Sequence, residues 1–275
     1  MVLPTTLGAA QQLARGRIPA SEARMLLCHL LGCGAAQISA YPERPLTEAL
    51  AQNFVELLAR RIAGEPMAYL LGVREFYGRD FAVGPAVLIP RPDTELIIEL
   101  ALELLGRDTR APILDLGTGS GALAVTLALE LPASQVMAVD FSAAALDVAR
   151  HNGERLGARV AWRESDWFTG VDATGFGLIV SNPPYIAEGD PHLSQGDLRF
   201  EPPTALASGP DGLDDLRRII HAAPGFLADD GWLLLEHGYD QAGLVRDLLD
   251  QAGYRDIRSA RDLASIERVT LGRRP

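Results

Sequence analysis

The chain has 275 residues, of which 48% are hydrophobic and 22% are charged. This balance excludes a disordered chain, a collagen-like fibre and a disulfide-stapled miniprotein, and the length suits two domains. The 25 basic and 36 acidic side chains give a net charge of −11, which disfavours tight nonspecific binding to nucleic acid.

The first 73 residues have the periodicity of helices and show no strand pattern. Ser21 is expected to cap a helix that ends at Gly32, and Thr47 is expected to open a second helix that stops at Gly64. We therefore predict a small helical domain over residues 1–73. The residues alone fit a stabilising cap and a recognition module for a bulky partner equally well.

Cys28 and Cys33 lie in this helical region and are too few for a disulfide framework, which is typical of a reducing compartment. His29 is the only nearby candidate for a further ligand, so we interpret the three side chains as packing residues and predict no metal. The apolar stretches are too short to cross a bilayer and no signal peptide is recognised. A cytoplasmic location is therefore expected.

Residues 74–90 differ in character, because aromatic and β-branched side chains alternate or cluster between glycines. This pattern predicts a short β-hairpin that links two domains. A helix is expected to follow, with Pro92 in its first turn and Asp93 or Thr94 as its cap.

From Pro112 onward, short apolar strands alternate with helices. Strands that are hydrophobic nearly throughout are typical of a parallel sheet covered on both faces, so we predict a doubly wound, Rossmann-like α/β domain over residues 91–275. Ligands of such sheets bind at the carboxyl ends of the strands. The expected strands end near residues 117, 140, 166, 182 and 238, and helices are expected from 120, from 142, over about 213–228 and from 240.

The turn after the first of these strands, residues 115–122, reads Asp-Leu-Gly-Thr-Gly-Ser-Gly-Ala. Its glycines permit a tight turn and a close approach of a ligand, and the following helix adds free N–H groups. Asp140 ends the next strand, where its carboxylate can bind both ribose hydroxyls of a nucleoside. Because the turn also fits the dinucleotide pattern, NAD and S-adenosylmethionine are both compatible with it.

Trp167 follows a third strand, directly after Asp166. An acid beside a flat aromatic ring at this strand end can bracket an adenine by a hydrogen bond and by stacking. The alternative for Trp167 is an ordinary core side chain.

The fourth strand is followed by Asn182, Pro183, Pro184 and Tyr185. The two prolines make the turn rigid and leave carbonyl oxygens, notably that of Pro183, without strand partners. Asn182 Oδ1 is a second acceptor, and Tyr185 supplies a flat face.

Two acceptors and a ring suit methyl transfer to a planar nitrogen, whose delocalised lone pair makes it a poor nucleophile. Acceptors that hold its N–H groups raise the electron density on nitrogen, align it with a methyl donor and stabilise the positive charge that develops. Hydride transfer to NAD needs no such arrangement, so the motif favours S-adenosylmethionine. The alternative is an Asx-Pro turn that merely ends a strand.

The Gly-rich turn, Asp140 and the Asn-Pro-Pro-Tyr motif together resemble the class I S-adenosylmethionine-dependent methyltransferases that act on planar nitrogen. More narrowly, the chain resembles the release-factor glutamine methyltransferases, the PrmC or HemK family. DNA adenine methyltransferases share Asn-Pro-Pro-Tyr, whereas the Ile-Pro-Arg-Pro-Asp-Thr-Glu stretch is more specific. The resemblance rests on residues 64–72, 76–78, 88–95, 182–186, 200–206, 211–213, 236–238 and 241.

This resemblance implies methylation of the side-chain amide of the glutamine in the Gly-Gly-Gln motif of bacterial peptide chain release factors. It implies S-adenosylmethionine as cofactor, a helical domain that docks the release factor, and no nucleic-acid or membrane partner. Asn182 and Pro183 would hold the amide, Pro184 and Tyr185 would shape its slot, and Arg91 and Glu201 would shape the pocket. By position, the implied cofactor-binding residues are Gly117, Thr118, Gly119, Ser120, Gly121, Asp140, Trp167 and Asn182.

Three other functions compete with this interpretation. A nucleic-acid amino-methyltransferase for adenine or guanine would use the same slot, but the acidic balance and the lack of a larger aromatic cradle argue against it. A nucleotide-binding scaffold without activity would not need Asn182. An NAD oxidoreductase would bind NAD tightly in place of S-adenosylmethionine.

Overall fold

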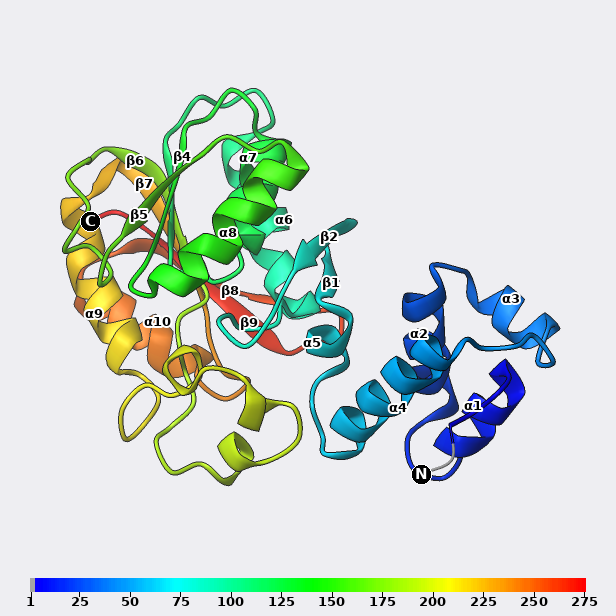
Figure 1. Ribbon diagram of the computed structural model, residues 1–275. Coiled ribbons are helices and arrows are strands. Elements are labelled where there is room, and N and C mark those ends of the chain that lie inside the picture. Colours follow the sequence, from blue (N-terminus) through cyan, green and yellow to red (C-terminus); the bar gives the residue numbers. More distant parts are fainter. Residues whose placement is uncertain (1–2) are drawn as a thin grey trace. The chain divides into compact units, whose positions relative to one another are not determined.

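The computed structural model describes residues 3–275 and divides into two compact units, one ending at Val73 and one running from Arg74 to Pro275 (Figure 1). The first unit is helical, and its core is formed by apolar side chains that include Leu7, Leu26, Phe54 and Leu58. Its helices are α1 (Leu7–Ala14), α2 (Ala20–Leu31), α3 (Ala35–Ala40), α4 (Glu48–Ile62) and α5 (Met67–Leu71).

The ends of these helices confirm one of the two predicted caps. The Thr47 hydroxyl accepts a hydrogen bond from the Leu50 N–H at 3.3 Å and opens α4. The cap predicted at Ser21 is wrong, because α2 already begins at Ala20 and Pro19 precedes it without a side-chain cap. The fixed φ of proline suits the start of a helix, so a polar cap is not required there.

The second unit contains, over the described residues, a seven-stranded sheet in the order β5-β4-β3-β6-β7-β9-β8. The first five strands in this order are parallel, and β9 and β8 are antiparallel to their neighbours. The sheet confirms the predicted α/β class. Its strands are β3 (Ile113–Leu116), β4 (Val136–Asp140), β5 (Val160–Glu164), β6 (Phe176–Ser181), β7 (Leu227–Glu236), β8 (Arg255–Arg261) and β9 (Glu267–Arg273).

Helices cover both faces of this sheet (Figure 1). Apolar side chains of α6 and α7 pack in one core cluster with inward-facing residues of β3 and β6, and those of α9 and α10 pack in a second cluster against the opposite face. This is the doubly wound arrangement. The helices are α6 (Glu95–Leu105), α7 (Ala122–Glu130), α8 (Ala143–Leu156), α9 (Asp214–Ala222) and α10 (Ala242–Gln251).

The strand order reverses at β3, which lies between β4 and β6. In the two parallel pairings, Leu116 is opposite Val139 on one side and Ser181 on the other. The segments that follow these strands therefore leave the sheet next to one another. A doubly wound fold has its ligand crevice at this point.

Two helix boundaries differ from the predictions. The helix expected over 213–228 ends at Ala222, because Pro224 lies in a short 3-10 turn, and β7 begins at Leu227. The helix expected from Ser120 begins at Ala122, after a left-handed Gly121.

The predicted hairpin is shorter than the range given for it and belongs to the second unit apart from its first residue. It consists of β1 (Val73–Phe76) and β2 (Arg79–Ala82). Phe76 and Phe81 meet edge to face, with their ring centroids 6.0 Å apart, and both are buried in the cluster that contains α6 and α7. The aromatic residues thus anchor the hairpin to the core.

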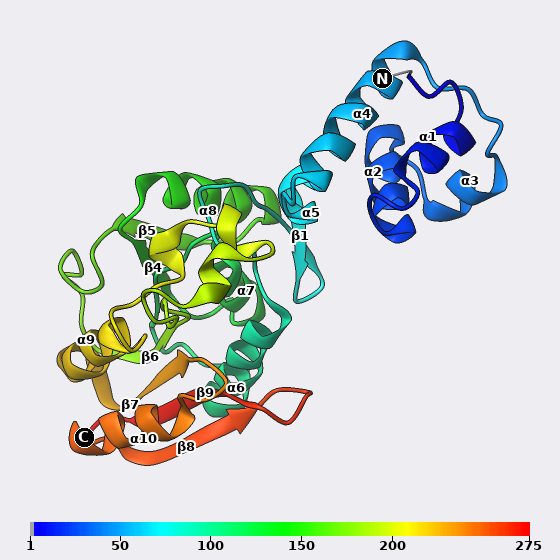
Figure 2. The same cartoon turned by 90° about the horizontal axis from the view of Figure 1, so that it is seen from below.

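The C-terminal strands β8 and β9 were not predicted (Figure 2). β8 is an edge strand that carries Arg255, Arg258 and Arg261, and its side chains are exposed or half-buried. Charged side chains are common on edge strands because they oppose pairing with other chains. They also mask the apolar pattern by which a strand is recognised in a sequence.

Candidate functional site

A cavity of about 560 Å³ lies at the carboxyl ends of the parallel strands. Gly117 and Gly119 line it from the turn after β3, Asp140 from the end of β4, Trp167 from the segment after β5, and Asn182 from the turn after β6. Four segments that are distant in the sequence thus contribute to one cavity. Pro184 also lines it, as do Phe141, Ser142, Asp215 and Arg218.

The Gly-rich turn needs glycine at two positions for steric reasons. Gly117 has φ of 69°, and a Cβ atom there would lie 3.2 Å from the Trp167 ring. Gly121 has φ of 81°, and a Cβ atom would lie 3.2 Å from both Ala149 and Trp162. Both backbone conformations favour glycine, and both positions are too crowded for a side chain to enter without rearrangement.

Thr118, Ser120 and Gly121 do not line the cavity. The N–H groups of Thr118 and Gly121 are bonded to the carbonyls of Val139 and Thr118, each at 2.9 Å. The Ser120 carbonyl accepts from Asn152 Nδ2 at 2.9 Å. These three residues build the turn in this structure, while Gly117 and Gly119 form its exposed wall.

Asp115 is the buried anchor of the turn. Its Oδ2 accepts from the Thr118 hydroxyl at 2.6 Å and from the Ala124 N–H at 3.2 Å, and Oδ1 has no hydrogen-bond partner within residues 3–275. Burial raises the pKa of Asp115 to about 7, with a smaller contribution from the charge of Asp140, although the two hydrogen bonds lower it. This carboxyl group therefore keeps its proton at pH values well above those at which an ordinary aspartate is already ionised.

Asp140 is held by two backbone N–H groups. Its Oδ1 accepts from Ser142 and its Oδ2 accepts from Gly119, both at 2.9 Å. Burial raises the pKa of Asp140, and these hydrogen bonds lower it. A carboxylate oxygen can accept more than one hydrogen bond, so this group can also accept from a pair of vicinal hydroxyl groups.

Trp167 is fixed by an unpredicted partner on α9. The indole Nε1 donates to Asp215 Oδ1 at 3.0 Å, and Asp215 Oδ2 accepts from the Ser208 hydroxyl at 2.8 Å. Trp167 has φ of 51°, which is unusual for a bulky residue. The surrounding contacts thus hold the ring in one place on the cavity wall.

A second cavity of about 170 Å³ adjoins the Asn-Pro-Pro-Tyr motif. Asn182, Pro183 and Tyr185 line it together with Leu88 and Arg91. Asn182 also lines the larger cavity, whereas Pro183 and Tyr185 do not. The two cavities therefore share a wall formed by Leu88, Asn182 and Ala205, of which Asn182 is the polar member.

Asn182 donates from Nδ2 to the Thr94 hydroxyl oxygen at 3.1 Å. Thr94 is at the N-cap position of α6, one of the two positions predicted, but its side chain makes no capping hydrogen bond and contacts Asn182 instead. The alternative cap, Asp93, lies in the 3-10 turn Pro92–Thr94, ahead of α6. The contact of Thr94 with Asn182 was not predicted, since a threonine near the start of a helix is usually interpreted as a cap.

Tyr185 is held at both its side chain and its backbone. Its hydroxyl donates to Glu236 Oε1 at 3.3 Å, and its carbonyl accepts from Gln241 Nε2 at 3.0 Å. Burial raises the pKa of Tyr185, and the adjacent Glu236 raises it further. Burial also raises the pKa of Glu236 to about 7, although the nearby hydroxyls of Thr94 and Tyr185 and the charge of Arg268 act to lower it.

Arg91 and Glu201 form an ion pair that joins two loops beside the smaller cavity. The Glu201 side chain is fully buried, and its Oε2 also accepts from the Ile89 N–H at 3.2 Å. Burial raises the pKa of Glu201 and the charge of Arg91 lowers it. Arg91 lines the cavity directly, whereas Glu201 acts from behind it.

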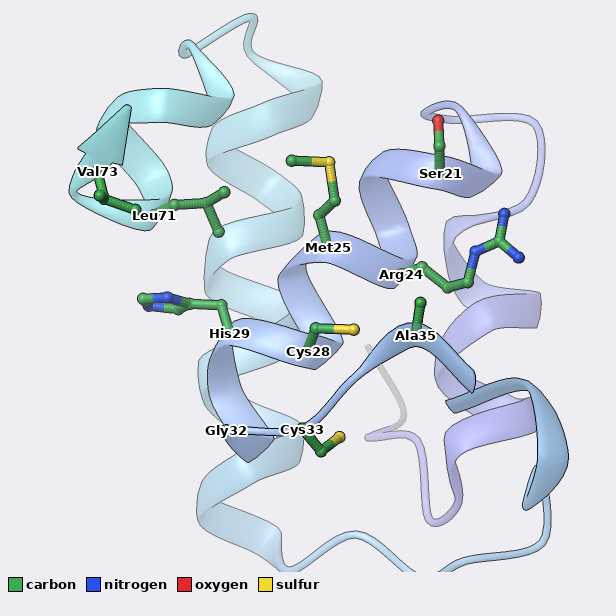
Figure 3. A pocket seen from close by; sticks show the side chains of 10 residues that line it. All are labelled: Ser21, Arg24, Met25, Cys28, His29, Gly32, Cys33, Ala35, Leu71 and Val73. Carbon is green, nitrogen blue, oxygen red and sulfur yellow. The ribbon is translucent and has the colours of Figure 1, made fainter. Parts of the chain in front are cut away.

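The predicted packing residues of the first unit lie along a groove of about 660 Å³ (Figure 3). Cys28 and Cys33 are free thiols, and the Cys28 sulfur points away from the His29 ring (Figure 3). No group of three or more His, Cys, Asp or Glu side chains suited to a metal ion occurs between residues 3 and 275. In the same range, no helix is long and apolar enough to cross a membrane.

The sequence matches known proteins over both units. Residues 7–72 match the family model of the PrmC N-terminal domain, and residues 95–197 match that of the methyltransferase small domain. The chain is 53% identical to the release factor glutamine methyltransferase of Bordetella pertussis, over 94% of this chain and 97% of that protein. It is 49% identical to that of Burkholderia pseudomallei, over 99% and 98%.

Among solved structures, the fold is similar to the 16S rRNA N2 G1207 methyltransferase of T. thermophilus, determined with AdoMet (S-adenosylmethionine) and guanosine. The TM-score is 0.54 and the identity is 19%, over 74% of this chain and 50% of that one. At this identity the likeness shows a shared fold.

Asp115→Asn is expected to remove a pH dependence of stability. A folded-state pKa of about 7 stabilises the protonated form, so this contribution is present in acid and is lost as pH rises through 7. In chemical denaturation of the ligand-free protein, the free energy of unfolding of the wild type relative to the variant should fall by about 2–3 kcal/mol between pH 5 and pH 8. A difference that is constant with pH would contradict a neutral Asp115.

Asp215→Ala is expected to weaken the binding of S-adenosylmethionine about three- to tenfold, because the Trp167 indole loses its hydrogen-bond partner. Isothermal calorimetry measures this change. Asp214→Ala is the matched control, since Asp214 is on the same turn but its exposed carboxylate pairs with Arg217. Equal affinity of the two variants would show that Asp215 does not position the ring.

Proposed function

The chain belongs to the release factor glutamine methyltransferases, and on this premise we propose how its two cavities perform methyl transfer. The larger cavity holds S-adenosylmethionine, and the smaller one holds the side chain of the substrate glutamine. The observation that supports this most strongly is the position of Asn182, which lines both cavities. A group at this wall can contact a methyl donor and a methyl acceptor at once.

In the larger cavity, the Asp140 carboxylate binds the ribose hydroxyls and the Trp167 ring stacks on the adenine. Gly117 and Gly119 allow the cofactor to lie close to the backbone. Thr118, Ser120 and Gly121 support this wall through the contacts that fix the turn.

In the smaller cavity, Asn182 Oδ1 and the Pro183 carbonyl accept the two N–H groups of the glutamine amide. Tyr185 shapes the slot, whereas Pro184, which was predicted to shape it too, lines the larger cavity next to it. Bound S-adenosylmethionine would supply its methyl group to the amide nitrogen, and the two oxygens would stabilise the positive charge that develops on nitrogen. The nitrogen would then lose its extra proton to water, with S-adenosylhomocysteine as the second product.

The substrate is the Gly-Gly-Gln glutamine of a peptide chain release factor, and the first unit docks the body of that protein. The match of residues 7–72 to the PrmC N-terminal domain supports this assignment. Because release factors act in translation, the proposal places the reaction in the cytoplasm. Nucleic acid is not a substrate in this proposal, consistent with the net charge of −11.

The activity is tested by incubation with methyl-labelled S-adenosylmethionine and a release factor, with DNA and RNA in parallel. Label is expected on the release factor and not on its variant in which alanine replaces the Gly-Gly-Gln glutamine. Mass spectrometry of the peptide should place one methyl group on the glutamine amide. Label on RNA or DNA alone would favour the nucleic-acid amino-methyltransferase.

Asn182→Ala should lower kcat about a hundredfold or more, because one of the two acceptors for the amide is lost. The dissociation constant of S-adenosylmethionine should change only modestly, since Asp140 and Trp167 remain. Single-turnover kinetics and calorimetry separate the two effects. Unchanged turnover would refute the role of Asn182 as an acceptor.

A further inference from the structure

We propose that Thr94 and Glu236 are positioning residues that fix the Asn182 amide with its oxygen, and not its nitrogen, toward the substrate. This inference rests on the proposed function and adds two residues that act through Asn182. Thr94 and Glu236 are 5% and 2% exposed. Neither lines either of the two cavities, so both act from behind the site.

An asparagine side chain can be reversed with almost no change in shape. Rotation about its last bond exchanges Oδ1, which accepts hydrogen bonds, for Nδ2, which donates them. With Nδ2 forward, the N–H groups of Asn182 would face those of the substrate amide, and the acceptor would be lost. The proposed chemistry therefore requires a device that selects one of the two orientations.

Thr94 supplies that selection if its hydroxyl can only accept from Asn182. The observed contact runs from Asn182 Nδ2 to Thr94 Oγ1 at 3.1 Å. A hydroxyl can donate or accept, so its direction depends on where its own hydrogen is directed. When that hydrogen is directed elsewhere, only the nitrogen of Asn182 can face Thr94.

Glu236 is the group that takes this hydrogen. Its carboxyl group contains only acceptors when it is ionised, as it is above its pKa of about 7, and the Thr94 hydroxyl is close enough to lower that pKa. Glu236 Oε2 is buried and has no hydrogen-bond partner in the part of the chain that the structure describes. A buried acceptor without a partner is unfavourable, which favours a Thr94 hydroxyl directed toward it.

The sheet register explains why these groups meet. Ser181, the last residue of β6, is opposite Leu235 of β7, so Asn182, which follows β6, and Glu236, which ends β7, come next on the two segments. Glu236 Oε1 also accepts from the Tyr185 hydroxyl at 3.3 Å. One carboxyl group therefore interacts with Tyr185 directly and with Asn182 through Thr94, and it holds both ends of the motif.

The test compares Thr94→Val with Thr94→Ser in the full-length enzyme. Valine keeps the shape but removes the hydroxyl, and kcat for release factor methylation should fall about ten- to a hundredfold. KM and the dissociation constant of S-adenosylmethionine should change less than about twofold, whereas Thr94→Ser should keep a kcat near that of the wild type. Thr126→Val is the matched control, since Thr126 is buried on α7 and its hydroxyl has no hydrogen-bond partner within residues 3–275.

Glu236→Gln provides an independent variant should Thr94→Val fail to fold. Glutamine has the same shape but one acceptor fewer, so either Thr94 or Tyr185 loses its partner and kcat should fall about tenfold. The inference is overturned if Thr94→Val keeps the kcat of the wild type, or if Thr94→Ser is as slow as Thr94→Val. If Thr94→Val does not fold, a Glu236→Gln variant with the full kcat of the wild type overturns it. A wild-type enzyme that transfers no methyl group to release factor would instead refute the proposed function, and the inference would fall with it.

Discussion

The parallel pairing of β3 with β6 is the constraint on which the site depends. It sets Leu116 opposite Ser181, so that the Gly-rich turn and the Asn-Pro-Pro-Tyr motif leave the sheet side by side. The next pairing, of β6 with β7, brings Glu236 behind the motif. A slip of one residue in either register would turn the strand side chains to the opposite face and separate these groups.

Buried carboxyl groups hold the loops around the two cavities. Asp115 fixes the Gly-rich turn, Glu201 ties Arg91 and the Ile89 backbone together, and Glu236 binds the Tyr185 hydroxyl. Desolvation disfavours the ionised form of each of these groups and so raises its pKa. Such groups are retained at functional sites when they define one geometry of the polar side chains around them.

The sequence predicts the sheet and the cavity-lining residues well, because buried parallel strands are apolar throughout and turn motifs are local. Residues that act across the fold were missed. Asp215 reads as an acid in the first turn of a helix and Thr94 as a cap, and their partners Trp167 and Asn182 are 48 and 88 residues away. The edge strand β8 was not predicted because its arginines interrupt the apolar pattern of a strand.

Pro183 and Pro184 have no backbone N–H, so at the proposed glutamine slot these two residues offer carbonyl oxygens and no main-chain donors. A glutamate side chain has nearly the outline of glutamine but would bring lone pairs against those oxygens. Discrimination between the two isosteres then comes from repulsion of the wrong one, a form of selectivity that a purely steric pocket cannot achieve.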